Sequence, residues 1–129
     1  MNKTILIAIC LAILLFTYLF QKLFIKEIEI IDQKFPDGSA KIISIYKQMF
    51  GNNKKVRELE FWKKNVLRYD KQFKNNVPYG LQIFYPKSGG KISQYIKNGQ
   101  RDGIYTEKDS LGKIIKQEHW LNGKMINDQ

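Results

Sequence analysis

The chain has 129 residues, 22 of them basic and 12 acidic, so its net charge at pH 7 is +10. This length fits a single domain. One cysteine, Cys10, and one histidine, His119, exclude an intrachain disulfide scaffold, a cysteine zinc site and a histidine pair for a metal. Eight Phe, seven Tyr and two Trp argue against disorder.

An apolar segment stands at the amino terminus. Residues 5–20 are all apolar or aromatic except Thr17, and they follow a short basic start at Lys3. A helix of this length spans roughly 25 Å, the lower limit for crossing a bilayer core, and Lys3 and Lys22 can reach the two interfaces. No small residue stands near its end, where a signal peptidase would cut. We therefore expect residues 1–24 to be an uncleaved signal-anchor and residues 25–129 to form the domain.

The sequence leaves the orientation of this anchor open. Lys22 and Lys26 outweigh Lys3, and the positive-inside rule then favours a cytoplasmic carboxyl terminus. An apolar span at the extreme start is, however, typical of a bacterial signal-anchor that exports the domain behind it. We expect a single-pass bacterial membrane protein with an extracytoplasmic domain. A cytoplasmic domain and a secreted domain with a cleaved leader are the alternatives.

The remainder of the chain reads as strands and turns, because it has no sustained helical period and its short alternating runs lie between turn signals. Pro36-Asp37-Gly38-Ser39 and Asn98-Gly99 are such turn signals. We predict strands over residues 24–32, 41–46, 56–62, 66–73, 81–85, 91–96, 104–106 and 114–120. This pattern predicts a mainly β fold built as an antiparallel meander.

A unit of about 23 residues recurs in this region. Residues 75–80 align with 98–103 at a shift of 23, and Asn98-Gly99 aligns with Asn122-Gly123 at a shift of 24. Asn and Gly tolerate the positive φ that tight hairpin turns need, and equal spacing lets successive hairpins join one sheet. The clearest repeats are 59–80, 81–103 and 104–129. The residues we assign to their turns are Gly80, Gly90, Asn98, Gly99, Gly103, Gly112, Asn122 and Gly123.

The repeat resembles a known family. The residues that carry the likeness are Tyr85…Gly90-Lys91-Ile92…Lys97-Asn98-Gly99…Asp102-Gly103 and Gly112-Lys113-Ile114…Trp120-Leu121-Asn122-Gly123. This pattern resembles MORN-type repeats, and more closely the YwqK-type variant of bacterial antitoxin-like repeat proteins. Lys108 and Asn76 depart from it, since the family usually has an aromatic residue and Gly there. The resemblance implies a single-layer antiparallel sheet of hairpins, often in exported or membrane-attached proteins, that binds rather than catalyses.

One stretch of the chain concentrates basic residues among aromatic ones such as Phe61, Trp62 and Tyr69. Its members are Lys54, Lys55, Arg57, Lys63, Lys64, Arg68, Lys71 and Lys74, against Glu58, Glu60 and Asp70. Alternation along a strand places aromatic rings on the core face and lysines in water, where they also protect sheet edges. A solvated face is therefore the ordinary interpretation. Contact with lipid head groups or another anionic surface is the alternative, and nucleic acid is not expected.

Nothing in the sequence indicates catalysis. Carboxylates are scattered, His119 has no Cys, His or Ser beside it, and Gly89-Gly90 does not lie between a strand and a helix. We expect no enzyme activity, no cofactor and no metal. Four aromatic residues, Tyr85, Tyr95, Tyr105 and Trp120, are expected to pack between hairpins, with a place on a binding face as the alternative.

These observations predict a membrane-anchored, non-catalytic repeat module. We expect it to bind an unknown protein or an anionic envelope component through its sheet. Self-association is a further option, because a single-layer sheet leaves faces and edges exposed. The rival hypothesis is a cytoplasm-facing, antitoxin-like protein that neutralises a partner.

Overall fold

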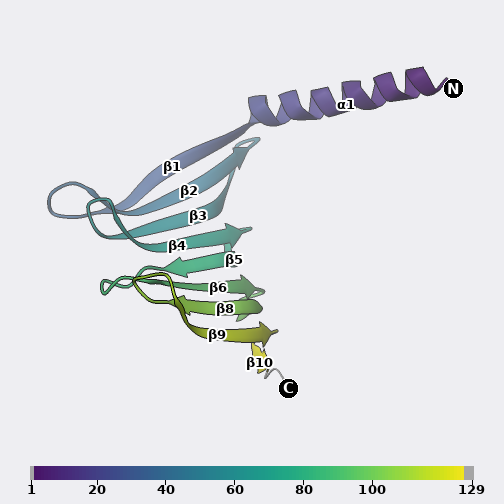
Figure 1. Cartoon of the computed structure of the whole chain (residues 1–129). Helices are drawn as coiled ribbons and strands as arrows, with labels where there is room; N and C mark the ends of the chain where they lie inside the picture. Colours follow the sequence, from purple (N-terminus) through teal and green to yellow (C-terminus); the bar gives the residue numbers. More distant parts are fainter. Residues whose placement is uncertain (1, 127–129) are drawn as a thin grey trace.

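The computed structural model describes residues 2–126, which form one helix and one antiparallel sheet of ten strands (Figure 1). The last three residues of the predicted third repeat, 127–129, lie outside the described residues. Helix α1 covers Lys3–Phe24. The strands are β1 (Ile25–Lys34), β2 (Ala40–Met49), β3 (Asn52–Lys63), β4 (Val66–Lys74), β5 (Val77–Phe84), β6 (Lys91–Lys97), β7 (Gln100–Arg101), β8 (Gly103–Lys108), β9 (Ile114–Leu121) and β10 (Lys124–Ile126). Their order in the sheet is β1-β2-β3-β4-β5-β6-β8-β9-β10, and β7 pairs with β6.

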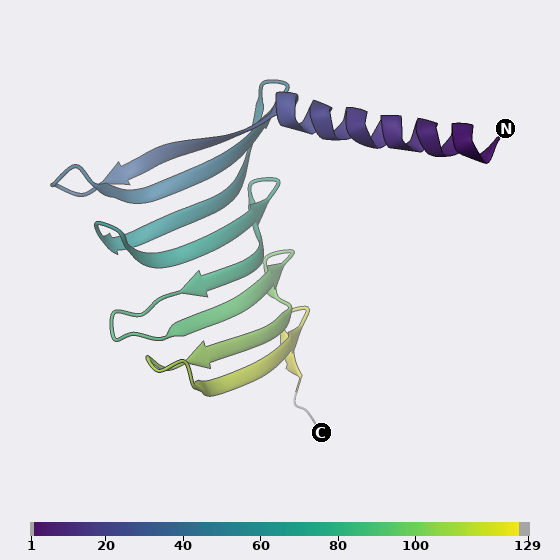
Figure 2. The same cartoon turned by 45° about the horizontal axis from the view of Figure 1, so that its top comes forward.

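The sheet is a single layer (Figure 2). Of the apolar side chains in the described part of the chain, only Ile45 and Ile83 are buried, each with 9% of its surface exposed. Ser44 is fully buried, and its hydroxyl donates a hydrogen bond to the Asp32 carboxylate. The prediction of a mainly β, single-layer sheet of antiparallel hairpins after an amino-terminal apolar helix is confirmed. Cross-strand side-chain pairs and the backbone ladder, rather than a deep core, hold such a sheet together.

The connections between the strands lie along the two sides of the sheet where the strands begin and end, and we call each of these sides an edge (Figure 2). Tight turns at 50–51, 75–76, 98–99 and 122–123 lie at the edge where α1 joins, which we call the anchor-side edge. The connections at 35–39, 64–65, 85–90 and 109–113 lie at the opposite edge, which we call the distal edge. The anchor-side turns recur every 23 to 25 residues, so each repeat contributes one hairpin turn to this edge.

Both residues of every anchor-side turn have positive φ, the backbone of a type I′ hairpin turn. Asn98 and Gly99 have φ of 51° and 75°, and Asn122 and Gly123 have 48° and 79°. The remaining residues assigned to turns, Gly80, Gly90, Gly103 and Gly112, also have positive φ. At Gly90 a side chain is also excluded for steric reasons, because a Cβ atom there would lie 2.3 Å from the Lys108 carbonyl oxygen.

The first anchor-side turn departs from the Asn pattern. Phe50 takes the first turn position with φ of 50°, where the other three turns have Asn. A bulky residue in this region costs about 1–2 kcal/mol. The Phe50 ring packs against α1, with its centroid 5.7 Å from that of Phe20 and 5.9 Å from that of Phe24. These aromatic contacts offset part of the strain.

Helix α1 continues into β1 without a linker, since the helix ends at Phe24 and the strand begins at Ile25. By length and composition, Lys3–Phe20 suffices to cross a membrane or to serve as a signal sequence, and none of it is buried. The helix leaves the sheet at the anchor-side edge and points away from the strands (Figure 1). Any membrane that holds α1 therefore lies beside that edge.

Strand bounds differ from the sequence prediction most at β3 and β5, which each begin four residues earlier than predicted, and the prediction lacks β7 and β10. Pro78 and Gly80 argue against a strand before residue 81, yet β5 begins at Val77. The Asn75-Asn76 turn pairs Lys74 with Val77 and Phe73 with Pro78, and a bulge follows between Lys71 and Phe73. β7 and β10 have two and three residues, too few for a visible alternation.

Candidate functional site

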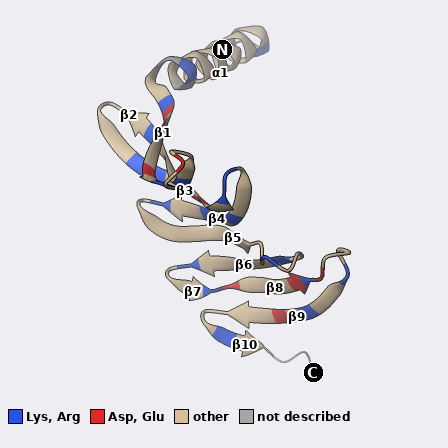
Figure 3. Ribbon diagram, turned by 90° about the vertical axis from the view of Figure 1, so that its left-hand side faces the viewer, with Lys and Arg blue, Asp and Glu red and all other residues tan. Residues whose placement is uncertain are grey.

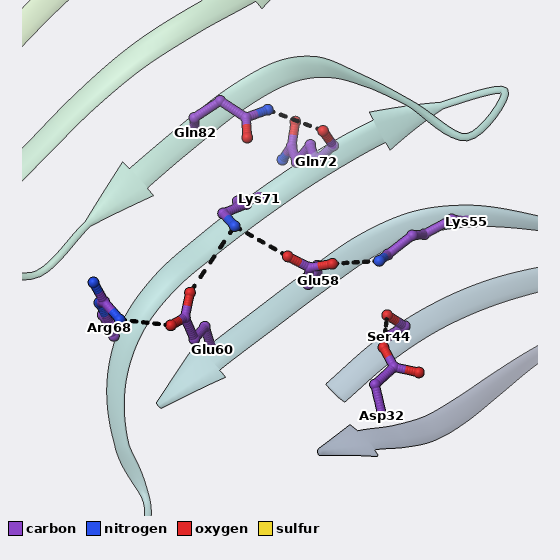
Figure 4. Close-up of polar contacts among 9 residues, drawn as sticks. All are labelled: Asp32, Ser44, Lys55, Glu58, Glu60, Arg68, Lys71, Gln72 and Gln82. Atoms are coloured by element: carbon purple, nitrogen blue, oxygen red, sulfur yellow. Dashed lines mark hydrogen bonds and ion pairs between the residues drawn. The ribbon is translucent and has the colours of Figure 1, made fainter. Parts of the chain in front are cut away.

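One face of the sheet carries a row of polar and charged side chains across neighbouring strands, and we call it the lattice face. Cross-strand pairing places Ser44 of β2 beside Glu58 of β3, Glu58 beside Lys71 of β4, and Lys71 beside Gln82 of β5. Figure 4 shows these side chains on one side of the strands. Register therefore brings together residues that lie 11 to 14 positions apart in the sequence.

Glu58 and Glu60 are the acceptors of this lattice. The Glu58 carboxylate accepts hydrogen bonds from Lys55 Nζ and, at 3.0 Å, from Lys71 Nζ. Arg68 Nη1 donates to Glu60 Oε1 at 2.7 Å. Burial alone raises the pKa of Glu58, but the hydrogen bonds from the two lysines outweigh it and lower the pKa below its ordinary value. Glu58 is therefore ionised at neutral pH.

Aromatic rings cover the cations of the lattice face. The Arg68 guanidinium carbon lies 4.2 Å from the Trp62 ring centroid and 5.1 Å from that of Tyr69. Lys71 Nζ lies 5.0 Å from the Tyr69 centroid, and the Tyr69 ring stacks on Phe84 at 4.7 Å. Such cation–π contacts hold long basic side chains flat against the sheet. The lattice is thus a paired, ordered surface rather than a set of free charges.

A groove of about 700 Å³ opens at the distal edge beside this lattice, and we call it the distal groove. It is lined by Trp62, Lys63, Val66, Leu67, Tyr85, Pro86, Lys87, Gly89 and Gly90, so none of its lining residues is acidic. Trp62 Nε1 donates a hydrogen bond to the Tyr85 carbonyl oxygen at 2.9 Å, and Lys87 Nζ lies 4.6 Å from the Trp62 ring centroid. Its lining thus combines aromatic and basic side chains.

The eight basic residues singled out from the sequence do not form one patch. Three of them, Lys55, Arg68 and Lys71, pair with carboxylates on the lattice face. Arg57 lies on the other face and forms a bidentate ion pair with Asp70, with Nε–Oδ1 and Nη2–Oδ2 distances of 2.7 and 2.6 Å. The hydrogen bonds to Asp70 raise the pKa of Arg57.

The other four basic residues are divided between the two edges. Lys54 Nζ is 3.4 Å from Asn75 Oδ1, and Lys74 Nζ is 5.0 Å from the Tyr79 ring centroid, both at the anchor-side edge. Lys63 and Lys64 lie at the distal β3–β4 turn. Figure 3 shows basic residues at both edges and acidic ones among them on the strands. Of these eight residues, the four that have no carboxylate partner in the described part of the chain thus lie at the edges.

The four aromatic residues named from the sequence also separate. Tyr105 and Trp120 share Arg101, whose guanidinium carbon lies 5.3 and 4.8 Å from their ring centroids. Tyr95 meets Tyr79 edge to face at 6.0 Å. Tyr85 lines the distal groove. Three of the four thus pack against neighbouring strands.

Sequence reasoning missed the distal groove because its walls come from separate hairpins. A signal for it was present: Trp62 and Tyr85 are 23 residues apart, one repeat length, and hence lie side by side on successive hairpins. Residues of the β5–β6 connection, such as Pro86 and Lys87, complete the groove.

The described residues thus define a class of protein: an apolar helix that runs directly into a one-layer sheet of antiparallel hairpins. Within residues 2–126 no group of three or more His, Cys, Asp and Glu side chains could hold a metal ion. Comparison of the chain with protein-family models, curated proteins and solved structures finds no match. The resemblance to MORN-type and YwqK-type repeats stays a prediction from the sequence.

Proposed function

We propose that this protein is a single-span, membrane-anchored binding module without catalytic activity. Its distal groove binds an anionic partner, either an acidic protein segment or an anionic envelope polymer. The observation that carries the proposal is the composition of the groove, which joins Trp62 and Tyr85 to Lys63 and Lys87 with no carboxylate in its lining. Aromatic surface supplies contact area, and the lysines supply attraction to negative charge.

The position of the groove supports this function. The distal edge lies on the side of the sheet away from α1 (Figure 2). With α1 in a bilayer, that edge points away from the lipid and is open to partners in the adjacent aqueous space. Because β1 begins at the residue after α1, with no linker between them, the sheet has little freedom to rotate toward the membrane.

The orientation of the anchor separates this proposal from its rival. An extracytoplasmic sheet meets wall polymers and extracellular proteins, whereas a cytoplasmic sheet meets intracellular proteins, as the antitoxin-like hypothesis requires. Both versions use the same groove. A secreted version would lack α1 and would leave the aromatic contacts of Phe50 with Phe20 and Phe24 unmade.

Binding is tested with the full-length protein in nanodiscs of neutral lipid, with Trp fluorescence as the readout and poly(glycerol phosphate) or polyglutamate as the probe. The variant K63E/K87E reverses two charges of the groove. At about 1 kcal/mol for each charge, it should weaken binding by roughly tenfold or more. The control K97E/K124E makes the same charge change at the anchor-side edge and should bind as the wild type does.

Two results would reject the proposed groove. One is the absence of binding to both polymers at low salt, where attraction between charges is strongest. The other is an equal loss of affinity in K63E/K87E and K97E/K124E, which would indicate a response to net charge rather than to a site.

A further inference from the structure

A second groove crosses the junction between α1 and the sheet, and we call it the junction groove. Its first part, about 300 Å³, is lined by Phe16, Thr17, Phe20, Ile25 and Met49. Its second part, about 350 Å³, is lined by Ile25, Lys47, Met49, Phe50, Asn52, Lys54, Val56, Phe73, Lys74 and Asn75. The parts share Ile25 and Met49, so the groove runs from the side of the helix onto the anchor-side edge.

The first part of the junction groove belongs to the depth of the lipid tails if α1 spans the membrane. Phe16, Thr17 and Phe20 lie at the carboxyl-terminal end of the apolar stretch Lys3–Phe20. The second part begins with the first residue of β1 and the last residue of β2, just beyond the helix. The groove therefore passes from the hydrocarbon toward the head-group region.

The lining of the junction groove becomes positively charged from its helix part to its sheet part. The helix part has no ionisable residue in its lining, and the sheet part has three lysines and no carboxylate. Lys54 Nζ lies near Asn75 Oδ1 and Lys74 Nζ faces the Tyr79 ring, so neither contact neutralises its charge. Lys47 Nζ is 3.9 Å from Glu27 Oε1, a long and exposed pair. Only the sheet part of the junction groove thus carries positive charge in its lining.

Phe50 gives an independent sign that this junction binds something apolar. It occupies a turn position that has Asn in the other three anchor-side turns, and it keeps a positive φ there. Its side chain remains 67% exposed although it touches Phe20 and Phe24. Residues held in sparsely populated backbone regions cluster at binding and active sites.

We propose that the junction groove binds one anionic phospholipid of the bilayer that holds α1. An acyl chain lies along Phe16, Phe20 and Met49, and the phosphate lies among Lys47, Lys54 and Lys74. This inference rests on the proposed membrane anchoring of the chain. It adds a specific lipid class, and it does not depend on the distal groove or on its partner.

The test uses the full-length protein in nanodiscs of equal parts phosphatidylcholine and phosphatidylglycerol, with native mass spectrometry to identify the lipids that stay bound. Wild-type protein should retain one phosphatidylglycerol in preference to phosphatidylcholine by roughly tenfold or more, because each nearby lysine attracts an anionic lipid several-fold. The variant K47E/K54E/K74E should lose this preference. The control K63E/K64E/K87E, with the same charge change at the distal edge, should keep it.

A second variant, F50N, tests the apolar wall while it keeps all three lysines and restores the Asn of the other turns. It should retain less of both lipids. Equal retention of the two lipids by the wild type, or equal loss in the two triple variants, would overturn the lipid site and leave the anchor intact. A chain that washes off membranes at alkaline pH would overturn both.

Discussion

Ile83→Ala tests how much of the stability comes from the few buried positions of this one-layer sheet. Ile83 lies on β5 between Asp70 of β4 and Ser93 of β6, with 9% of its surface exposed. The substitution deletes three carbon groups at about 0.8 kcal/mol each, or about 2.4 kcal/mol. A one-layer sheet lets neighbours and water fill the space, so the added cavity cost should be small and the total about 2.5 kcal/mol.

Ile104→Ala on β8 is the matched control, because it makes the same deletion on the same face of the sheet, with 55% of the side chain exposed. Only about half of the Ile104 side-chain surface is removed from water, so Ile104→Ala should lower the unfolding free energy by about 1 kcal/mol. Denaturant unfolding of the full-length protein in neutral nanodiscs, followed by the fluorescence of Trp62 and Trp120, measures both losses. Equal losses, or a larger one at Ile104, would refute the assignment of Ile83 to the core.

Three further predictions concern the lattice face, the turns and the distal groove. Because the pKa of Glu58 is below its ordinary 4.5, the stabilising contribution of the Glu58 carboxylate is present above pH 4.5 and is lost as the pH falls through the lowered pKa. Glu58→Gln should therefore lower the unfolding free energy by about 1–3 kcal/mol at pH 7. In denaturant unfolding across pH, the stability of this variant should converge on that of the wild type in acid. Asn122→Ala should lower the unfolding free energy by about 1 kcal/mol, because φ at this turn position is 48° and alanine is strained there. An unchanged melting temperature of this variant would argue against this turn. Trp62→Phe removes the hydrogen bond to Tyr85 and should lower the unfolding free energy by about 1 kcal/mol in the same denaturant assay; an unchanged value would count against that contact.

The fold was largely predictable because its turns carry local chemistry. Asn98-Gly99 and Asn122-Gly123 are the residues that a type I′ turn favours, and they mark hairpins without any tertiary information. Phe50 carries no such signal, and the nearest turn-forming residues, Gly51-Asn52-Asn53, follow it in the sequence, although Asn52 and Asn53 belong to β3. The positive φ of Phe50 depends on packing against α1, a contact between segments that no local pattern reveals.

The candidate site was less predictable because register decides which charges meet. Arg57 and Glu58 are adjacent in sequence, yet strand alternation sends them to opposite faces and gives them different partners. A bulge between the pairs Glu60–Tyr69 and Phe61–Leu67 leaves Arg68 as the extra residue, and its side chain meets Glu60 on the lattice face. Bulges leave little mark in a sequence, so the division of the basic residues between faces and edges needed the structure.

The topology of the full-length chain tests the proposed anchored, exported sheet most directly. A tag after Gln129 is followed in intact cells or spheroplasts treated with protease, and membrane and soluble fractions are compared. We predict a membrane-bound tag that is digested without lysis, with the sheet outside. A tag protected until lysis would place the sheet in the cytoplasm and favour the antitoxin-like hypothesis. A tag in the soluble fraction would contradict the anchor itself.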